Sequence, residues 1–169
     1  MEPLHEAEIR ASFVNCTKGE AGRANLPRDF AELPWADLDF LGWRDPGAPE
    51  RGYLVADYHG RTVAVALRSG SGGGGGFTAR SICTLCKTTR TGGGVTLMSA
   101  RKAGESGRNG NSVGQYICAD LACSLYIRGK KVSAGTLLDE TLDLESKIAR
   151  TRAGLDAFLR RVAPALRAG

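Results

Sequence analysis

The sequence predicts an α+β fold, and three observations carry that prediction. Apolar and alternating residues at 53–58 and 61–68 flank a His-Gly pair, which is the pattern of a β-hairpin. Two further strand-like segments, 95–101 and 113–118, bracket a loop rich in Gly, Asn and Arg. Near the end of the chain, residues 141–163 have the spacing of a long amphipathic helix.

The N-terminal region begins with a second helical pattern. Residues 5–18 place Ile9, Phe13 and Cys16 at positions i, i+4 and i+7, which predicts a short amphipathic helix. Cys16 is then a free thiol packed on the apolar face of this helix. The stretch 33–43 carries both tryptophans of the chain, and it predicts a loop packed on the core. A binding surface is the alternative for this loop.

Four of the five cysteines form two close pairs, and these predict a metal site. Cys83 and Cys86 are separated by two residues, and Cys118 and Cys123 by four. Two such pairs are typical of a tetrahedral four-cysteine zinc site. A redox motif, an iron–sulfur cluster and unliganded buried cysteines are the alternatives. Four thiolates leave no open coordination position, so we expect the zinc to be structural.

The order of elements around the cysteines predicts a treble-clef zinc finger. A knuckle at 83–86 is followed by the hairpin and then by a short helix or turn that carries Cys123. Four thiolates on Zn²⁺ have a net charge of −2, and basic neighbours of the knuckle offset it. These neighbours are Arg80, Lys87 and Arg90. The glycine run 72–76 is predicted to link the first hairpin to this segment.

The C-terminal helix has recognisable ends and one apolar stripe. Thr141 or Asp143 can cap its first turn, and Pro164 ends it. The stripe consists of Leu144, Ile148, Leu155, Leu159 and Val162. We expect it to pack against a hairpin or the N-terminal helix.

The basic residues are concentrated in one segment. The net charge of the chain is +5, and residues 80–131 contain nine Lys/Arg and only two Asp/Glu. This field favours an anionic partner, with a solvated basic surface as the alternative. The longest apolar run, 63–67, is too short to span a membrane, and the N-terminus lacks the features of a secretory signal. We therefore expect a cytoplasmic protein.

Catalytic patterns are lacking. No Ser-His-Asp or Cys-His-Asp arrangement stands out, and the two histidines are isolated. The glycine runs at 72–76 and 92–94 lack the Gly-Lys-Ser/Thr of a phosphate loop. We therefore expect a protein that is not an enzyme.

Residues 80–131 resemble a known family. The segments CTLC at 83–86, VTLMSARK at 95–102 and GNSVGQYICADLACSLYIRGK at 110–130 are similar to the elongation factor G-binding protein family. This is the FusB-type family of fusidic-acid-resistance proteins, whose C-terminal treble-clef zinc finger is called the FBP domain. The flanking segments resemble actinobacterial single-domain members.

The resemblance implies a zinc-stabilised domain that binds elongation factor G and helps to release it from the ribosome. It matches one Zn²⁺ to Cys83, Cys86, Cys118 and Cys123. We expect three segments: an N-terminal helix and Trp/Pro-rich region at 1–52, the hairpin, glycine linker and FBP core at 53–131, and the C-terminal helix at 132–169. Together they are expected to form one compact domain.

Two functions follow as hypotheses. The first is a non-enzymatic, translation-associated protein that docks on elongation factor G or the ribosome. The alternative is a zinc finger that binds RNA directly, with Asn109, Asn111 and Tyr116 adding polar or stacking contacts. In both, the partner is expected to meet a basic face formed by Arg101, Lys102, Arg108, Arg128, Lys130 and Lys131.

Overall fold

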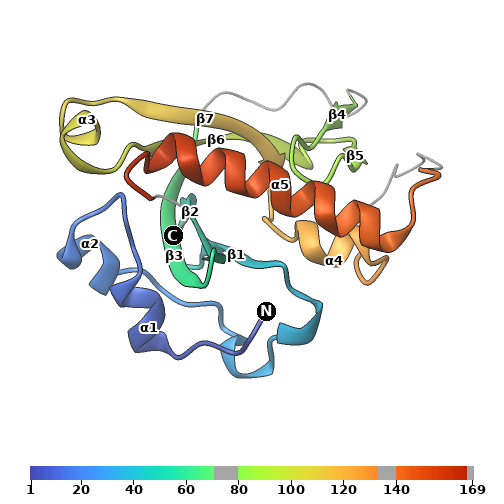
Figure 1. The fold of residues 1–169 in the computed structure, drawn as a ribbon, viewed down its shortest axis with the longest axis horizontal. Helices are drawn as coiled ribbons and strands as arrows, with labels where there is room; N and C mark the ends of the chain where they lie inside the picture. Colours follow the sequence, from blue (N-terminus) through green and yellow to red (C-terminus); the bar gives the residue numbers. More distant parts are fainter. Residues whose placement is uncertain (71–79, 133–139, 167–169) are drawn as a thin grey trace.

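The computed structural model describes residues 1–70, 80–132 and 140–166 (Figure 1). Its centre is a five-stranded antiparallel sheet in the order β1-β2-β3-β6-β7. A two-stranded ribbon, β4-β5, lies apart from this sheet. The strands of the large sheet are β1 (Phe40–Asp45), β2 (Ala48–Tyr58), β3 (Arg61–Ser69), β6 (Val95–Arg101) and β7 (Ser112–Cys118). The α+β class is confirmed.

The first hairpin is confirmed, with a longer first strand than predicted. Tyr58 pairs with Arg61, so the turn consists of His59 and Gly60. Both turn residues have positive φ angles, 53° and 78°, which matches the twist of a two-residue hairpin. β2 starts at Ala48 and ends at Tyr58, so it crosses the boundary that was expected between residues 52 and 53.

A different part of the chain packs on each face of the sheet. The long helix α5 (Leu144–Val162) lies across one face, where its apolar side chains join those of β2, β3, β6 and β7 (Figure 1). The N-terminal segment covers the β1–β3 part of the other face. There Ile9 and Phe13 pack with Trp43, Tyr53 and other sheet residues.

The helix predicted over 5–18 is shorter than expected, because the chain leaves the helical path at Ser12. Helix α1 (Glu6–Ala11) is followed by an extended stretch and then by α2 (Lys18–Gly22). In that stretch Ser12 O accepts a hydrogen bond from Ala64 N at 2.9 Å, and Val14 N donates to Ala64 O at 3.0 Å. β3 pairs with β6 at its last two residues, so the edge at Ala64 is open to residues 12–14. Cys16 therefore lies outside any helix.

The segment 33–43 is only partly the loop that was predicted. Single turns at Phe30–Glu32 and Trp35–Asp37 precede β1, which begins at Phe40. Trp43 lies in β1 and is 5% exposed, and its Nε1 donates to Asn25 O at 2.8 Å. The expectation that the tryptophans pack on the core is confirmed for the buried Trp43 and for the partly buried Trp35, whereas β1 itself was not predicted.

The C-terminal half follows the predicted order. After β4 (Ser81–Ile82) and β5 (Thr89–Arg90) come β6, β7 and then the short helix α4 (Cys123–Ile127). The expected loop between β6 and β7 contains one helical turn, α3 (Gly104–Arg108). A Cβ on Gly107 would lie 1.7 Å from Lys102 O, so this turn requires glycine. The glycine run 72–76 lies outside the described residues.

Helix α5 begins at Leu144 because Asp143 Oδ1 accepts a hydrogen bond from Ser146 N at 2.7 Å. The predicted stripe is confirmed at Leu155, Leu159 and Val162, which are at most 2% exposed. Leu144 is 47% exposed and stays off the core, since the helix only reaches the sheet further along. The buried Phe158 also joins this face and was not part of the predicted stripe.

Candidate metal centre

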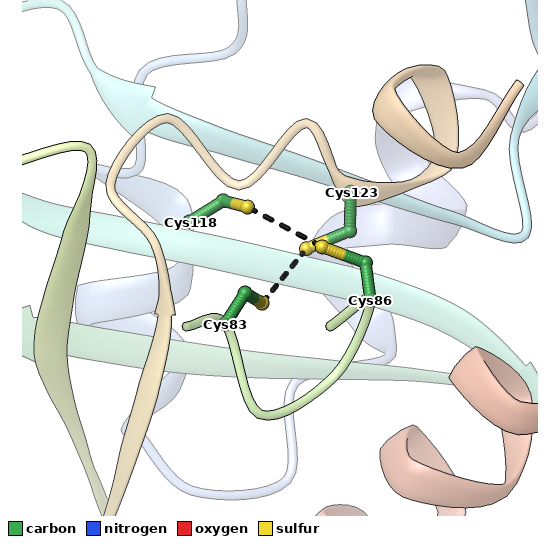
Figure 2. Close-up of side chains that lie close together, drawn as sticks. All are labelled: Cys83, Cys86, Cys118 and Cys123. Atoms are coloured by element: carbon green, nitrogen blue, oxygen red, sulfur yellow. Dashed lines mark hydrogen bonds between the residues drawn. The ribbon is translucent and has the colours of Figure 1, made fainter. Parts of the chain in front are cut away.

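The four paired cysteines meet at one point (Figure 2). Their sulfur atoms all lie within 4.8 Å of one another, and all four residues are buried. Cys83 Sγ is 3.7 Å from Cys123 Sγ, and Cys86 Sγ is 3.6 Å from Cys118 Sγ. Four sulfurs at ~2.3 Å from a tetrahedral zinc ion are separated by roughly 3.8 Å. The spacing fits zinc and is too long for disulfides, whose sulfurs are ~2.05 Å apart.

The first pair lies on a tight knuckle between β4 and β5. Cys83 N donates to Thr88 O at 3.1 Å, and Lys87 N donates to Cys83 O at 3.0 Å. Lys87 takes a positive φ of 60°, which closes the turn. Thr84 then ties the knuckle to β7, because its N and Oγ1 both donate to Tyr116 O, at 2.8 and 2.7 Å.

The second pair is carried by the end of β7 and the start of α4. Between them Leu121 has a positive φ of 59°, and its N donates to Cys118 O at 2.9 Å. The loop packs directly on the large sheet, where two strands carry glycines. A Cβ on Gly42 would lie 2.6 Å from Leu121 Cβ, and one on Gly52 would lie 3.0 Å from Leu121 Cδ1. The sulfur cluster is thus fixed to the sheet by close backbone packing.

A buried arginine provides positive charge beside the sulfurs. Arg90 is 8% exposed, and its guanidinium lies 4.0 Å above the Tyr126 ring and 3.9 Å from an Asp120 oxygen. Its Nε and Nη1 are buried without a hydrogen-bond partner in the described part of the chain. Burial alone would lower the pKa of Arg90, but Tyr126, Asp120 and Cys118 raise it. A zinc tetrathiolate, with its charge of −2, suits this buried cation, whose ion pair with Asp120 is long at 3.9 Å. Arg80 and Lys87, the other two expected neighbours, are exposed.

The donor set therefore fits zinc in chemistry as well as in spacing. Four cysteine sulfurs are a usual ligand set of structural zinc. Thiolates are the form that binds the metal. The four cysteines would hold the ion and fill its coordination sphere, so the ion would join the knuckle to the end of β7 and the start of α4. It would leave no position for an activated water.

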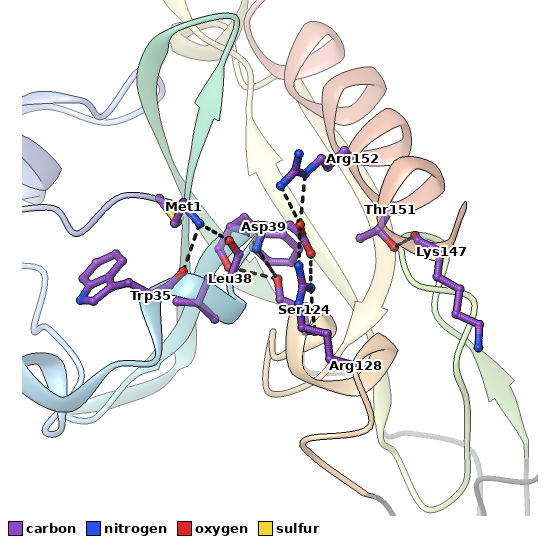
Figure 3. Close-up of polar contacts among 10 residues, drawn as sticks. Met1, Trp35, Leu38, Asp39, Ser124, Arg128, Lys147, Thr151 and Arg152 are labelled. Atoms are coloured by element: carbon purple, nitrogen blue, oxygen red, sulfur yellow. Dashed lines mark hydrogen bonds and ion pairs between the residues drawn. The ribbon is translucent and has the colours of Figure 1, made fainter. Parts of the chain in front are cut away.

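Arg128 belongs to the core rather than to a partner-facing surface (Figure 3). Its side chain is 11% exposed and forms a two-pronged ion pair with Asp39, at 2.5 and 3.1 Å. Arg152 reaches the same carboxylate from α5, at 3.0 Å. Ser124 Oγ accepts hydrogen bonds from Asp39 N at 3.0 Å and Phe40 N at 3.5 Å. This network joins the N-terminal segment to α4 and α5.

The other predicted basic residues separate into two groups. Lys130 and Lys131 follow α4, where they pair with Asp37 at 2.6 Å and Asp120 at 2.9 Å. The second group, at the far end of the β6–β7 hairpin beside α3, consists of Arg101, Lys102 and Arg108. Figure 1 shows α3 and α4 at opposite ends of the molecule. The six residues predicted to form one basic face therefore lie in separate groups, because six residue steps of strand, about 20 Å, separate the two ends of β6.

The residues predicted to contact RNA also lie at two separate places in the fold. Asn109 and Asn111 are exposed beside Arg108 at the hairpin tip. Tyr116 is 56% exposed, and it lies two residues before the end of β7 that carries Cys118. Sequence reasoning missed Asp39, whose partners lie 89 and 113 residues away.

Comparisons with known proteins agree with this geometry. The family model for the FBP C-terminal treble-clef zinc-finger matches residues 8–162. A solved structure with a similar fold is that of the fusidic acid resistance protein FusC, at 12% identity and a TM-score of 0.50. The similarity covers 83% of this chain and 52% of FusC, so this chain spans about half the length of that protein. Comparison with curated proteins gave no significant match.

In the described part of the chain, no helix is both long and apolar enough to cross a membrane. The family match extends over nearly the whole chain and includes all four clustered cysteines. The protein binds one structural zinc ion, and it belongs to the family defined by the FBP C-terminal treble-clef zinc finger.

Proposed function

We propose that this protein is a non-enzymatic, cytoplasmic translation factor that binds elongation factor G on the ribosome. The observation that carries the proposal is the family match over residues 8–162. The FusC-like fold supports it, because FusC is a fusidic acid resistance protein. A filled tetrathiolate site suits a binding role, since it offers no position for substrate or water.

In this proposal the zinc ion has a positioning role. Cys83, Cys86, Cys118 and Cys123 are its ligands, and the ion joins the knuckle, the end of β7 and the start of α4. The knuckle, β7 and α4 then present a rigid surface. A surface that is already ordered loses little conformational entropy when a partner docks.

The basic group best placed to meet a partner lies at the tip of the β6–β7 hairpin and consists of Arg101, Lys102 and Arg108. Lys102 N donates to Asn111 O at 2.9 Å, and Ala103 N donates to Val162 O at 2.7 Å, so the tip is fixed to the hairpin and to α5. The side chains of Lys102 and Arg108 have no ion pair within the described residues. Lys130 and Lys131 already have acidic partners, so their charge is partly neutralised.

The test is a titration of elongation factor G, alone and on ribosomes, with the zinc-loaded protein. The double variant Lys102→Glu with Arg108→Glu should weaken binding about tenfold, equivalent to about 1.4 kcal/mol. A matched reversal at exposed sites away from the tip, Arg28→Glu with Arg61→Glu, should change it much less. Binding of the native protein should weaken as salt rises, because exposed charges act through a screened field. Failure of the native protein to bind in either setting would refute the proposal.

A further inference from the structure

A cleft of about 320 Å³ lies between the N-terminal segment and the sheet, on the face opposite α5. It is lined by Asn15, Cys16 and Glu20 on one side and by residues of β2, β3, β6 and β7 on the other. Volumes of roughly 300–1,000 Å³ are usual for ligand sites. Four arginines from separate parts of the chain also line it: Arg23, Arg51, Arg68 and Arg101.

The walls of the cleft are held in place by one buried side chain. Asn15 is 8% exposed, and its Nδ2 donates to Ala66 O at 2.9 Å and to Arg101 O at 3.0 Å. Its Oδ1 accepts from Ala66 N at 2.8 Å. These bonds tie the N-terminal segment to β3 and β6, so the cleft is already formed in the free protein.

The cleft has a net positive charge, with four arginines and one glutamate among its lining residues. Arg51 and Arg68 are directly opposite one another on β2 and β3, an arrangement in which like charges repel. Within the described residues, the one ion pair made by any of the four arginines is Arg51 with its neighbour Glu50, at 3.6 Å. Glu20 is the single acid among the lining residues, and its carboxylate accepts from Thr17 N and Oγ1 at 2.9 and 3.0 Å. A bound anion would relieve this repulsion.

An exposed aromatic platform continues from the cleft along the same face. Leu97 and Tyr116 form a cross-strand pair on β6 and β7, and they are 40% and 56% exposed. Side chains alternate along a strand, so Leu97, Ser99 and Arg101 share one face. The platform and the Arg101 end of the cleft are four residue steps apart, about 14 Å.

We propose that the cleft and this platform together bind a short segment of single-stranded RNA. A planar guanidinium group can donate two parallel hydrogen bonds to a pair of phosphate oxygens, and four arginines line the cleft where the strand's backbone would lie. An exposed tyrosine on a sheet surface, next to such a groove, is where an unpaired base stacks. An acidic peptide would use the arginines but would have no comparable need for the tyrosine ring. The platform is therefore the feature that favours RNA.

The experiment measures fluorescence anisotropy of a labelled oligouridine of about ten nucleotides with the zinc-loaded full chain at low salt. Binding should weaken about tenfold in Arg51→Gln with Arg68→Gln, and the salt slope should fall by about 0.7 for each lost phosphate contact. Tyr116→Leu, which keeps an apolar side chain, should weaken binding about 5- to 100-fold. The matched control Arg61→Gln with Arg160→Gln should stay within about twofold of the native protein.

Several results would overturn the proposal. They are absence of RNA binding by the native protein, equal losses in the cleft and control variants, and unchanged affinity in Tyr116→Leu. Tighter binding of a labelled oligoglutamate than of RNA, insensitive to Tyr116→Leu, would assign the cleft to an acidic peptide instead. Zinc content and circular dichroism of each variant verify that it is folded. The assay contains no elongation factor, so its outcome is independent of the function proposed above.

Discussion

Replacing Asp39 with asparagine should destabilise the protein strongly, because it removes the counter-charge of a buried arginine. The Asp39 side chain is fully buried, and Arg128, at 11% exposure, has both of its terminal nitrogens on that carboxylate. Asparagine preserves the shape of the side chain but not its charge. The Arg128 guanidinium would then remain buried without a counter-charge, with its hydrogen bond to Ser124 O still in place.

The size of the effect follows from this burial. Breaking a buried ion pair by removing one partner costs about 3–5 kcal/mol. In a chain of this size each kcal/mol lowers Tm by about 2–4 °C, so the expected decrease is roughly 6–20 °C. Arg152 contacts the same carboxylate but is 59% exposed, so Arg152→Ala should cost less than about 1 kcal/mol.

The assay is urea unfolding of Asp39→Asn, Arg128→Ala and the double variant, all loaded with zinc. The two single variants should each lose several kcal/mol, and the double variant should lose much less than their sum, because the two residues form one interaction. If Arg128→Ala were as stable as the native protein and weakened partner binding instead, Arg128 would be a surface contact and this account of the network would be refuted.

The remaining predictions concern the core, the pH dependence and the fifth cysteine. Leu155→Ala should cost about 2–5 kcal/mol in urea unfolding, since Leu155 lies on the buried face of α5 and is 2% exposed, and a loss below about 1 kcal/mol would contradict this packing. Burial alone would raise the pKa of Asp45, but hydrogen bonds to its carboxylate outweigh burial and lower that pKa. Asp45 therefore contributes stability above its ordinary pKa of about 3.9, which is lost as pH falls through the lower native value. Unfolding at pH 7 and pH 3 should show a smaller acid-induced loss in Asp45→Asn than in the native protein, and an equal loss would count against this role. Burial raises the pKa of the Cys16 thiol to about 11, so alkylation of the native protein at Cys16 should be slow at pH 7.5, whereas fast labelling there would disprove it.

The features that could be predicted from the sequence are those encoded over a few neighbouring residues. The hairpin turning at His59 and Gly60 and the buried stripe of α5 follow from short periodic patterns. The spacing of the two cysteine pairs predicts the sulfur cluster, since the members of each pair lie within a few residues of one another. The sequence does not state which strand lies beside which, but for these elements the local pattern is enough.

The features that could not be predicted depend on partners far along the chain. The helix expected at 5–18 ends early because Ser12 bonds to Ala64, 52 residues later, and no local pattern indicates that contact. From the sequence alone Arg128 resembles an exposed cation, because nothing local indicates its contact with Asp39. The arginines of the cleft come from four separate places in the sequence, so only the folded chain brings them together.

The most direct test of the account is the zinc content of the purified protein, measured together with its near-UV circular dichroism. We expect about one zinc per chain in the native protein and in Cys16→Ser. In Cys83→Ser and Cys118→Ser we expect loss of the metal and of the near-UV signal, because metal binding and folding are linked in a small finger of this kind. A native preparation that contains no metal and has an unchanged near-UV spectrum would contradict the account.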